Sequence, residues 1–210
     1  MRKTATILAA LIFPASVWSA NLWAAPASGQ SFGDGVAAYS LQDYAGALAI
    51  WLPLANAGDS EAQFRAGLMY LNGRGVAADS AEAAHWFQLA GGAGLARASY
   101  MLGEMYAAGN GVEEDAHQAF EWYFSAAEQG DPRAQLQTGI LYLDGEITNS
   151  DWVQAHVWFS RAAEGTIEGE FRDLAETARD RTFEALTPEE RREAAELLGD
   201  TDTVDEDDSE

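Results

Sequence analysis

The sequence predicts an all-α solenoid of antiparallel helix pairs, and three observations support this fold class. The chain repeats itself with a period of 36 residues over four units, and self-similarity at such a period is typical of stacked supersecondary units. Within each unit, apolar residues recur at the spacing of one face of an α-helix. Glycines recur where these helices would end. The period is set by four aspartates, Asp43, Asp79, Asp115 and Asp151.

Residues 1–27 are predicted to be a secretory signal peptide. Arg2 and Lys3 precede an apolar run over residues 5–18, and small residues follow it. A membrane anchor is less well supported, because the run is shorter than the roughly 20 residues that cross a bilayer. Cleavage after Ala20, Ala24 or Ala27 is compatible with the pattern. We therefore expect a periplasmic or secreted mature chain.

Each unit is predicted to be a helix, a turn, a second helix and a second turn. The aspartate begins the first helix, because its carboxylate accepts hydrogen bonds from free N–H groups of the first turn and suits the positive end of the dipole. Asp59 and the pair Asp131-Pro132 begin the second helix in two of the units. Glycines are predicted to end the first helices at Gly58, Gly94 and Gly130, and the second helices at Gly73, Gly109 and Gly145.

Another glycine column lies inside the second helix, at Gly67, Gly103 and Gly139. Glycine there costs roughly 1 kcal/mol relative to alanine, so a compensating contact is expected. We expect close approach of the paired first helix, whose alanine column is also small. Large rings are expected to fill the space between successive pairs as core. The alanines are Ala47, Ala83 and Ala119, and the rings are Trp86, Trp122 and Trp158 with Trp51, Phe87, Tyr123 and Phe159 beside them.

These units resemble Sel1-like repeats, which are close relatives of tetratricopeptide repeats with a slightly longer unit. The resemblance rests on the elements LG-x-x-Y, G-x-GV, D-x-x-x-A and W-[FY]-x-x-A-A, and it spans about Val36 to Ala163. It is carried by AQFRAGLMYLNGRGVAADSAEA, ASYMLGEMYAAGNGVEEDAHQA and WYFSAAEQGDPRAQLQTGILY. The resemblance implies a right-handed superhelical stack of antiparallel helix pairs that acts as an adaptor between proteins or cell-envelope components.

The C-terminal end departs from the repeat pattern. In the fourth unit Thr166 replaces the turn glycine and the LG-x-x-Y element is lost, so its second helix is predicted to be a polar terminal cap. Thr187, Pro188 and Glu190 predict the start of a closing helix that runs to Leu198. Residues 200–210 carry seven acidic side chains and predict a disordered tail. The predicted solenoid with its closing helix therefore spans residues 28–199.

The composition disfavours several classes of function. The formal net charge of −22 repels phosphate backbones and anionic lipid headgroups, so neither nucleic-acid binding nor membrane insertion of the mature chain is expected. The chain has no cysteine, and Lys3 is its only lysine. The three histidines, His85, His117 and His156, stand at different offsets in their helices and do not predict a metal site. We expect no catalytic residues, no cofactor and no metal.

A partner-binding groove is predicted along the first helices, at one side of the buried stripe. Several side chains there are apolar where solvent exposure would favour polar residues, which suggests contact with a partner segment. Packing of the same side chains against the adjacent unit is an equally open alternative. The predicted groove residues are Leu48, Leu52, Gln88, His117, Phe120, Phe124 and His156.

The sequence thus predicts a non-catalytic, monomeric adaptor or scaffold of the bacterial cell envelope that binds a protein partner, either an envelope protein or a sensor domain. One alternative is a structural subunit of an envelope or secretion complex. Another is the β-lactam binding linked to some Sel1-like proteins. That alternative is disfavoured because the chain has neither cysteine nor an S-x-x-K element.

Overall fold

The computed structural model describes residues 29–145, 147, 150–165 and 169–199, and these form ten α-helices without a β-strand. The predicted signal peptide, the predicted acidic tail and Thr166 lie outside the described residues. The helices are α1 (Phe32–Ser40), α2 (Tyr44–Asn56), α3 (Ser60–Asn72), α4 (Ser80–Gly92), α5 (Ala96–Ala108), α6 (Ala116–Glu128), α7 (Pro132–Asp144), α8 (Trp152–Glu164), α9 (Glu170–Ala185) and α10 (Pro188–Leu198).

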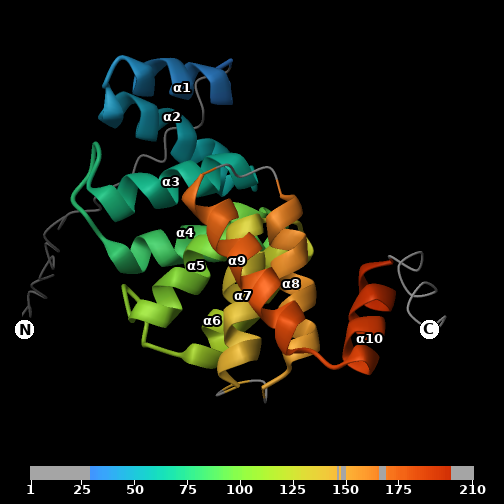
Figure 1. The fold of residues 1–210 in the computed structure, drawn as a ribbon. Helices are drawn as coiled ribbons and strands as arrows, with labels where there is room; N and C mark the ends of the chain where they lie inside the picture. Colours follow the sequence, from blue (N-terminus) through green and yellow to red (C-terminus); the bar gives the residue numbers. More distant parts are fainter. Residues whose placement is uncertain (1–28, 146, 148–149, 166–168, 200–210) are drawn as a thin grey trace, which may run out of the picture.

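The helices stack in chain order, as Figure 1 shows from α1 at the upper end to α9. From α1 to α9 each helix packs mainly against the helices before and after it, whereas α10 packs against α8. The all-α helical repeat solenoid predicted from the sequence is confirmed. Buried residues form several clusters along the stack rather than one central core, as expected when each repeat contacts only its neighbours.

The predicted caps are confirmed at both ends of the helices. The carboxylate of Asp79 accepts hydrogen bonds from the backbone N–H groups of Ala81 and Glu82, both at 3.0 Å. Asp43, Asp115 and Asp151 cap α2, α6 and α8 in the same way. Gly73 ends α3 at φ 63°, a left-handed conformation that disfavours a side chain. Gly109 and Gly145 end α5 and α7 with the same geometry.

The glycine column inside the second helices has a different reason from the one expected. A Cβ on Gly67 would lie 2.6 Å from the ring of Phe87, which belongs to α4 of the following unit rather than to the paired α2. Gly103 and Gly139 likewise lie against Tyr123 and Phe159, where a Cβ would approach to 2.7 and 2.5 Å. Each glycine therefore admits a ring from the next helix along the chain.

An additional helix precedes the predicted units and pairs with the first helix of the first unit. Helix α1 was not predicted from the repeat pattern; it begins with a capping box between Ser31 and Asp34. Gly35 in α1 is buried against Trp51 of α2, so α1 and α2 repeat the contact made by α3 and α4. The periodicity is hidden because only residues 41–43 connect α1 to α2, whereas residues 73–79 connect α3 to α4.

Two helices close the C-terminal end. Ala175 of α9 stands one period after Gly139, and it is buried in a cluster with Phe159. The predicted closing helix is confirmed as α10, which begins with a capping box between Thr187 and Glu190. It places Ala194 against Val153 and Val157 of α8. The predicted polar cap, α9, also carries apolar side chains at its surface, because Phe171 and Leu174 are exposed.

Candidate partner-binding groove

The predicted groove residues fall into three environments, and two of them are interior. Leu48 is only 6% exposed and belongs to the same buried cluster as Trp86 of α4. His156 is 7% exposed and faces α9. The prediction that these two side chains line an open surface was wrong, because the position five residues after each capping aspartate faces the following repeat.

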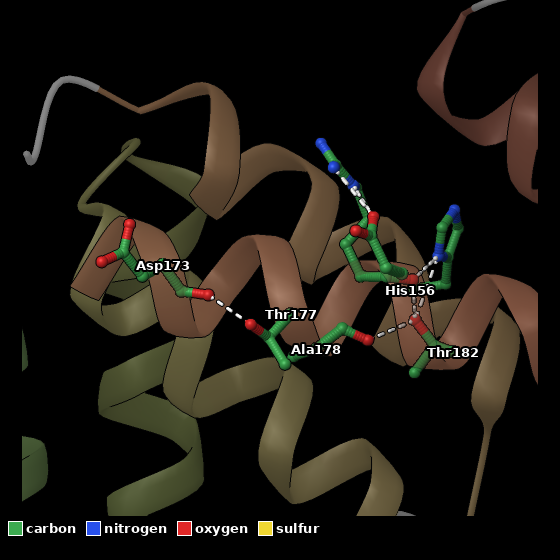
Figure 2. Close-up of polar contacts among 7 residues, drawn as sticks. His156, Asp173, Thr177, Ala178 and Thr182 are labelled. Atoms are coloured by element: carbon green, nitrogen blue, oxygen red, sulfur yellow. Dashed lines mark hydrogen bonds and ion pairs between the residues drawn. The ribbon is translucent and has the colours of Figure 1, made fainter. Parts of the chain in front are cut away.

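His156 of α8 forms hydrogen bonds with α9 (Figure 2). Its Nδ1 lies 3.2 Å from the carbonyl oxygen of Arg179 and 3.0 Å from Oγ1 of Thr182. Because a carbonyl oxygen only accepts, Nδ1 carries the proton and donates. The Thr182 hydroxyl has its own acceptors, the carbonyl oxygens of Ala178 at 2.9 Å and Arg179 at 2.8 Å. Burial lowers the pKa of His156 below its usual value, so the ring is neutral at neutral pH.

Phe120 and Phe124 lie on α6 and are half-buried against the next repeat. The ring of Phe120 meets Tyr142 edge-on at 5.7 Å, and that of Phe124 meets Trp158 edge-on at 5.5 Å. These contacts favour the alternative in which both rings pack against the adjacent unit. Partial exposure leaves one edge of each ring at the surface.

The other three predicted residues remain accessible. Gln88 of α4 and His117 of α6 are exposed, and Leu52 of α2 is half-buried. Leu52 differs from Phe120 and Phe124 because it borders an open cavity rather than a filled interface. Whether a partner binds along these residues stays a prediction.

The cavity beside Leu52 lies between α2 and α4, over α3, and has a volume of about 490 Å³. This size is within the range of ligand pockets. Its apolar wall includes Trp86 and Leu89, and Leu89 is 41% exposed. Its polar groups include the Glu82 carboxylate and the His85 imidazole. The full lining is Leu52, Ala55, Asn56, Gln63, Tyr70, Glu82, His85, Trp86 and Leu89.

Negative charge gathers at this cavity. Burial raises the pKa of the Tyr70 hydroxyl, and the carboxylates of Glu82 and Asp79 raise it further. Among the described residues, the ion pairs of the chain do not include Glu82. The cavity therefore combines an apolar wall with a carboxylate that has no cationic partner in the described part of the chain.

Buried polar atoms also border the cavity. The amide nitrogen of Gln63 donates to the carbonyl oxygen of Ala55 at 3.0 Å, which fixes the orientation of the side-chain amide. Its Oε1 and the indole Nε1 of Trp86 have no partner among the described residues. Trp158 has an unpartnered Nε1 as well, although Phe124 covers its ring. The indole nitrogen therefore does not distinguish the cavity from a filled groove.

Two tyrosines outside the cavity have strongly perturbed pKa values without forming a reactive site. Burial raises the pKa of Tyr100 to about 12, and the nearby Glu104 adds to this shift. Burial also raises the pKa of Tyr123, whose hydroxyl donates a hydrogen bond to Glu104. Because both phenols stay protonated at neutral pH, neither is an activated nucleophile.

Sequence reasoning found only Leu52 among the residues that line the cavity. A comparison of equivalent positions points to the space itself, since Leu52 stands where the third unit has the larger Phe124, beside the same tryptophan column. Within the described ranges, no group of three or more histidine, aspartate or glutamate side chains could hold a metal ion. None of the helices in those ranges is both long and apolar enough to span a bilayer.

Comparison with known proteins identifies the helix pairs. The Sel1 repeat matches residues 60–95, 96–131 and 132–166, which contain α3–α4, α5–α6 and α7–α8. The family's repeat thus begins with the helix that the 36-residue frame placed second. No curated protein is significantly similar to the chain.

Two solved structures share the fold. The crystal structure of a Sel1 repeat protein from Oxalobacter formigenes is 25% identical, with a TM-score of 0.64 over 80% of this chain and 75% of that one. The crystal structure of c5321, a protective antigen present in uropathogenic Escherichia coli strains with an SLR fold, is 26% identical, with a TM-score of 0.61. That match covers 80% of this chain and 41% of c5321. Because the three repeat matches run without a gap through the middle of the stack and account for half of the sequence, the chain belongs to the Sel1 repeat family.

Proposed function

We propose that this chain is a non-catalytic adaptor of the bacterial cell envelope that holds a protein partner along the first helices of its repeats. Proteins with Sel1 repeats generally mediate protein–protein interactions. A partner bound in the groove and a location in the cell envelope extend this general role.

The observation that carries the proposal is the cavity between α2 and α4. It lies on the side of the stack where the sequence predicts partner binding, and Leu89 beside it is exposed. Apolar side chains bordered by Glu82, His85 and Asn56 form the combination typical of a recognition surface. An apolar patch kept open at a surface stabilises the fold less than a covered one, which supports a binding role.

Site-specific cross-linking tests the adaptor role. A photoreactive residue at Gln88, an exposed position of α4, should give a discrete adduct with another protein in cells that produce the chain. The same residue at Glu193, exposed on α10 at the far end of the stack, should not. Equal adducts from both positions, or none from Gln88, would contradict partner binding on this side.

The envelope location is tested separately. It is supported by Arg2, Lys3 and the apolar run over residues 5–18. Mass measurement of the chain from a periplasmic fraction should give a new N-terminus between Asn21 and Ser28. A cytoplasmic chain that retains Met1 would refute export.

Recovery of the cross-linked pair in a fixed stoichiometric assembly would indicate a structural subunit of a complex instead of an adaptor.

A further inference from the structure

Two grooves of the stack are equivalent by the repeat and differ in content. The first groove lies between α2 and α4, and the third groove lies between α6 and α8. Leu52 and Trp86 of the first groove correspond to Phe124 and Trp158 of the third, each pair 72 residues apart. Each groove therefore has a tryptophan at the same position, but the side chain next to it differs in size between the two grooves.

In the third groove, the chain supplies its own occupant. The ring of Phe124 lies 5.5 Å from that of Trp158 at an interplanar angle of 72°. It also lies 5.7 Å from Phe120, which meets Tyr142 edge-on. Edge-to-face packing at these distances is a favourable arrangement of aromatic rings. The third groove thus shows how an aromatic side chain fits over the tryptophan column.

In the first groove, the equivalent space is open. Leucine replaces phenylalanine at Leu52, and a cavity of about 490 Å³ lies between it and Trp86. Tyr70, the equivalent of Tyr142, also lines the cavity. The same kind of aromatic wall therefore borders the cavity, and here the imidazole of His85 rather than a phenylalanine meets the tryptophan edge-on, at 5.6 Å.

The negative charge around the first groove favours a positively charged partner segment. Glu82 and Asp79 both act on the Tyr70 hydroxyl, so two carboxylates lie near this wall. The whole chain carries a formal net charge of −22, which opposes docking of a second copy and of anionic surfaces. A partner with positive charge beside its aromatic side chain meets both features of the cavity.

We infer that the first groove binds a basic segment of a partner protein by taking up one aromatic side chain against Trp86. The ring occupies the place that Phe124 holds over Trp158, and a neighbouring lysine or arginine of the partner faces Glu82. This inference rests on the proposed adaptor function, because it names the chemistry of the segment that the adaptor recognises.

Titration with short peptides tests the inference. The probes are a peptide with one phenylalanine flanked by lysines, a second with alanine in place of the phenylalanine, and a third with glutamates in place of the lysines. Binding to the purified full chain is followed by NMR through the resonances of α2 and α4. Only the first peptide should give saturable shifts there, centred on the indole of Trp86. Equal binding of the alanine peptide or of the acidic peptide would overturn the inference.

A matched pair of variants locates the site. Leu52→Phe introduces the side chain that the third groove already accommodates, so it should fill the cavity and weaken binding by at least about tenfold. Glu193→Phe adds the same ring at an exposed position of α10 instead, and binding should stay within about twofold of wild type. A Leu52→Phe chain that melts like wild type and binds unchanged would refute the assigned cavity.

A charge variant provides a test that does not depend on repacking. Glu82→Gln should weaken binding of the phenylalanine peptide by roughly twofold to fivefold and reduce its salt dependence. Unchanged affinity and salt dependence would refute the role of Glu82. Cross-linking from Gln88 that persists in Leu52→Phe would leave the adaptor function standing and refute the occupant. If the chain with wild-type Leu52 gave no cross-linked adduct from Gln88, the adaptor function itself would be refuted.

Discussion

At Gly67, the absence of a side chain lets the ring of Phe87 rest against the backbone of α3. A Cβ there would lie 2.6 Å from the ring, and the ring is fully buried. Because α4 and its neighbours hold Phe87 from the other side, the ring has no free volume into which to retreat. The contact therefore constrains the distance between two helices through one residue.

We expect Gly67→Ala to destabilise the protein. Overpacking of a filled core costs about 1–3 kcal/mol, and the better helix propensity of alanine returns roughly 1 kcal/mol. The net loss should be up to about 2 kcal/mol in urea unfolding. Gly92→Ala is the control, since a Cβ at Gly92 meets nothing within 4 Å. That variant should match or slightly exceed wild-type stability, and a loss equal to that of Gly67→Ala would refute the contact.

Sequence patterns predicted the caps well and the groove residues less well, for a physical reason. A capping carboxylate bonds to N–H groups two or three residues away, so the pattern contains both partners. Exposure of Leu48 or Phe124 depends instead on which side chain the next repeat places opposite it. Comparison within a single unit does not contain that information, and only equivalent positions across units reveal it.

At the scale of the element, α9 depends on one buried imidazole. His156 donates from Nδ1 toward the Arg179 carbonyl and Thr182, and protonation of the ring would place a charge in this buried contact. Burial is the largest effect on the pKa of His156 and lowers it; the hydrogen bond to the Arg179 carbonyl oxygen and the charge of Asp180 raise it, whereas the charge of Arg179 lowers it. The attachment of α9 is therefore sensitive to acid.

We expect stability to fall as the pH decreases through about 6.5, the usual pKa of histidine in an unfolded chain. The folded-state pKa is lower, so the unfolded chain takes up a proton that the folded chain does not. The contribution of His156 to the free energy of unfolding is fully present above this pH. It decreases as the pH falls further, until the pH reaches the folded-state pKa. In unfolding curves from pH 7.5 to 5, His156→Gln should reduce the loss. The exposed His117→Gln should leave it unchanged, and equal slopes for all three chains would contradict the assignment.

The element scale also shows what periodicity missed. Helix α1 was not predicted because a shorter connection to α2 shifts it out of the 36-residue frame. Its Gly35 nevertheless contacts Trp51 as the glycines of later units contact their rings. Helix α10 was predicted because its capping box is local. Its position against α8 could not be predicted, since Val153 and Val157 stand where the equivalent residues of α4 and α6 are exposed.

At the scale of the whole molecule, stability is distributed along a line. Contacts from α1 to α9 connect mainly successive helices, so interior pairs have two neighbours and terminal helices have one. Hydrogen exchange followed by mass spectrometry should show the strongest protection in α5 and α6 and the weakest in α1 and α10. Uniform protection across all ten helices would indicate a single cooperative unit instead.

Ala175 interrupts the glycine column at the C-terminal end of the stack. Every interior second helix offers a glycine, and the following helix fills the gap with a ring. At Ala175, one period after Gly139, a methyl group stands instead and is buried in a cluster with residues of α8, and the helix that follows packs on α8 rather than on α9. An engineered array that appends further units after α9 should therefore require glycine at this position. We therefore expect the single methyl group of this alanine to oppose the addition of a further repeat.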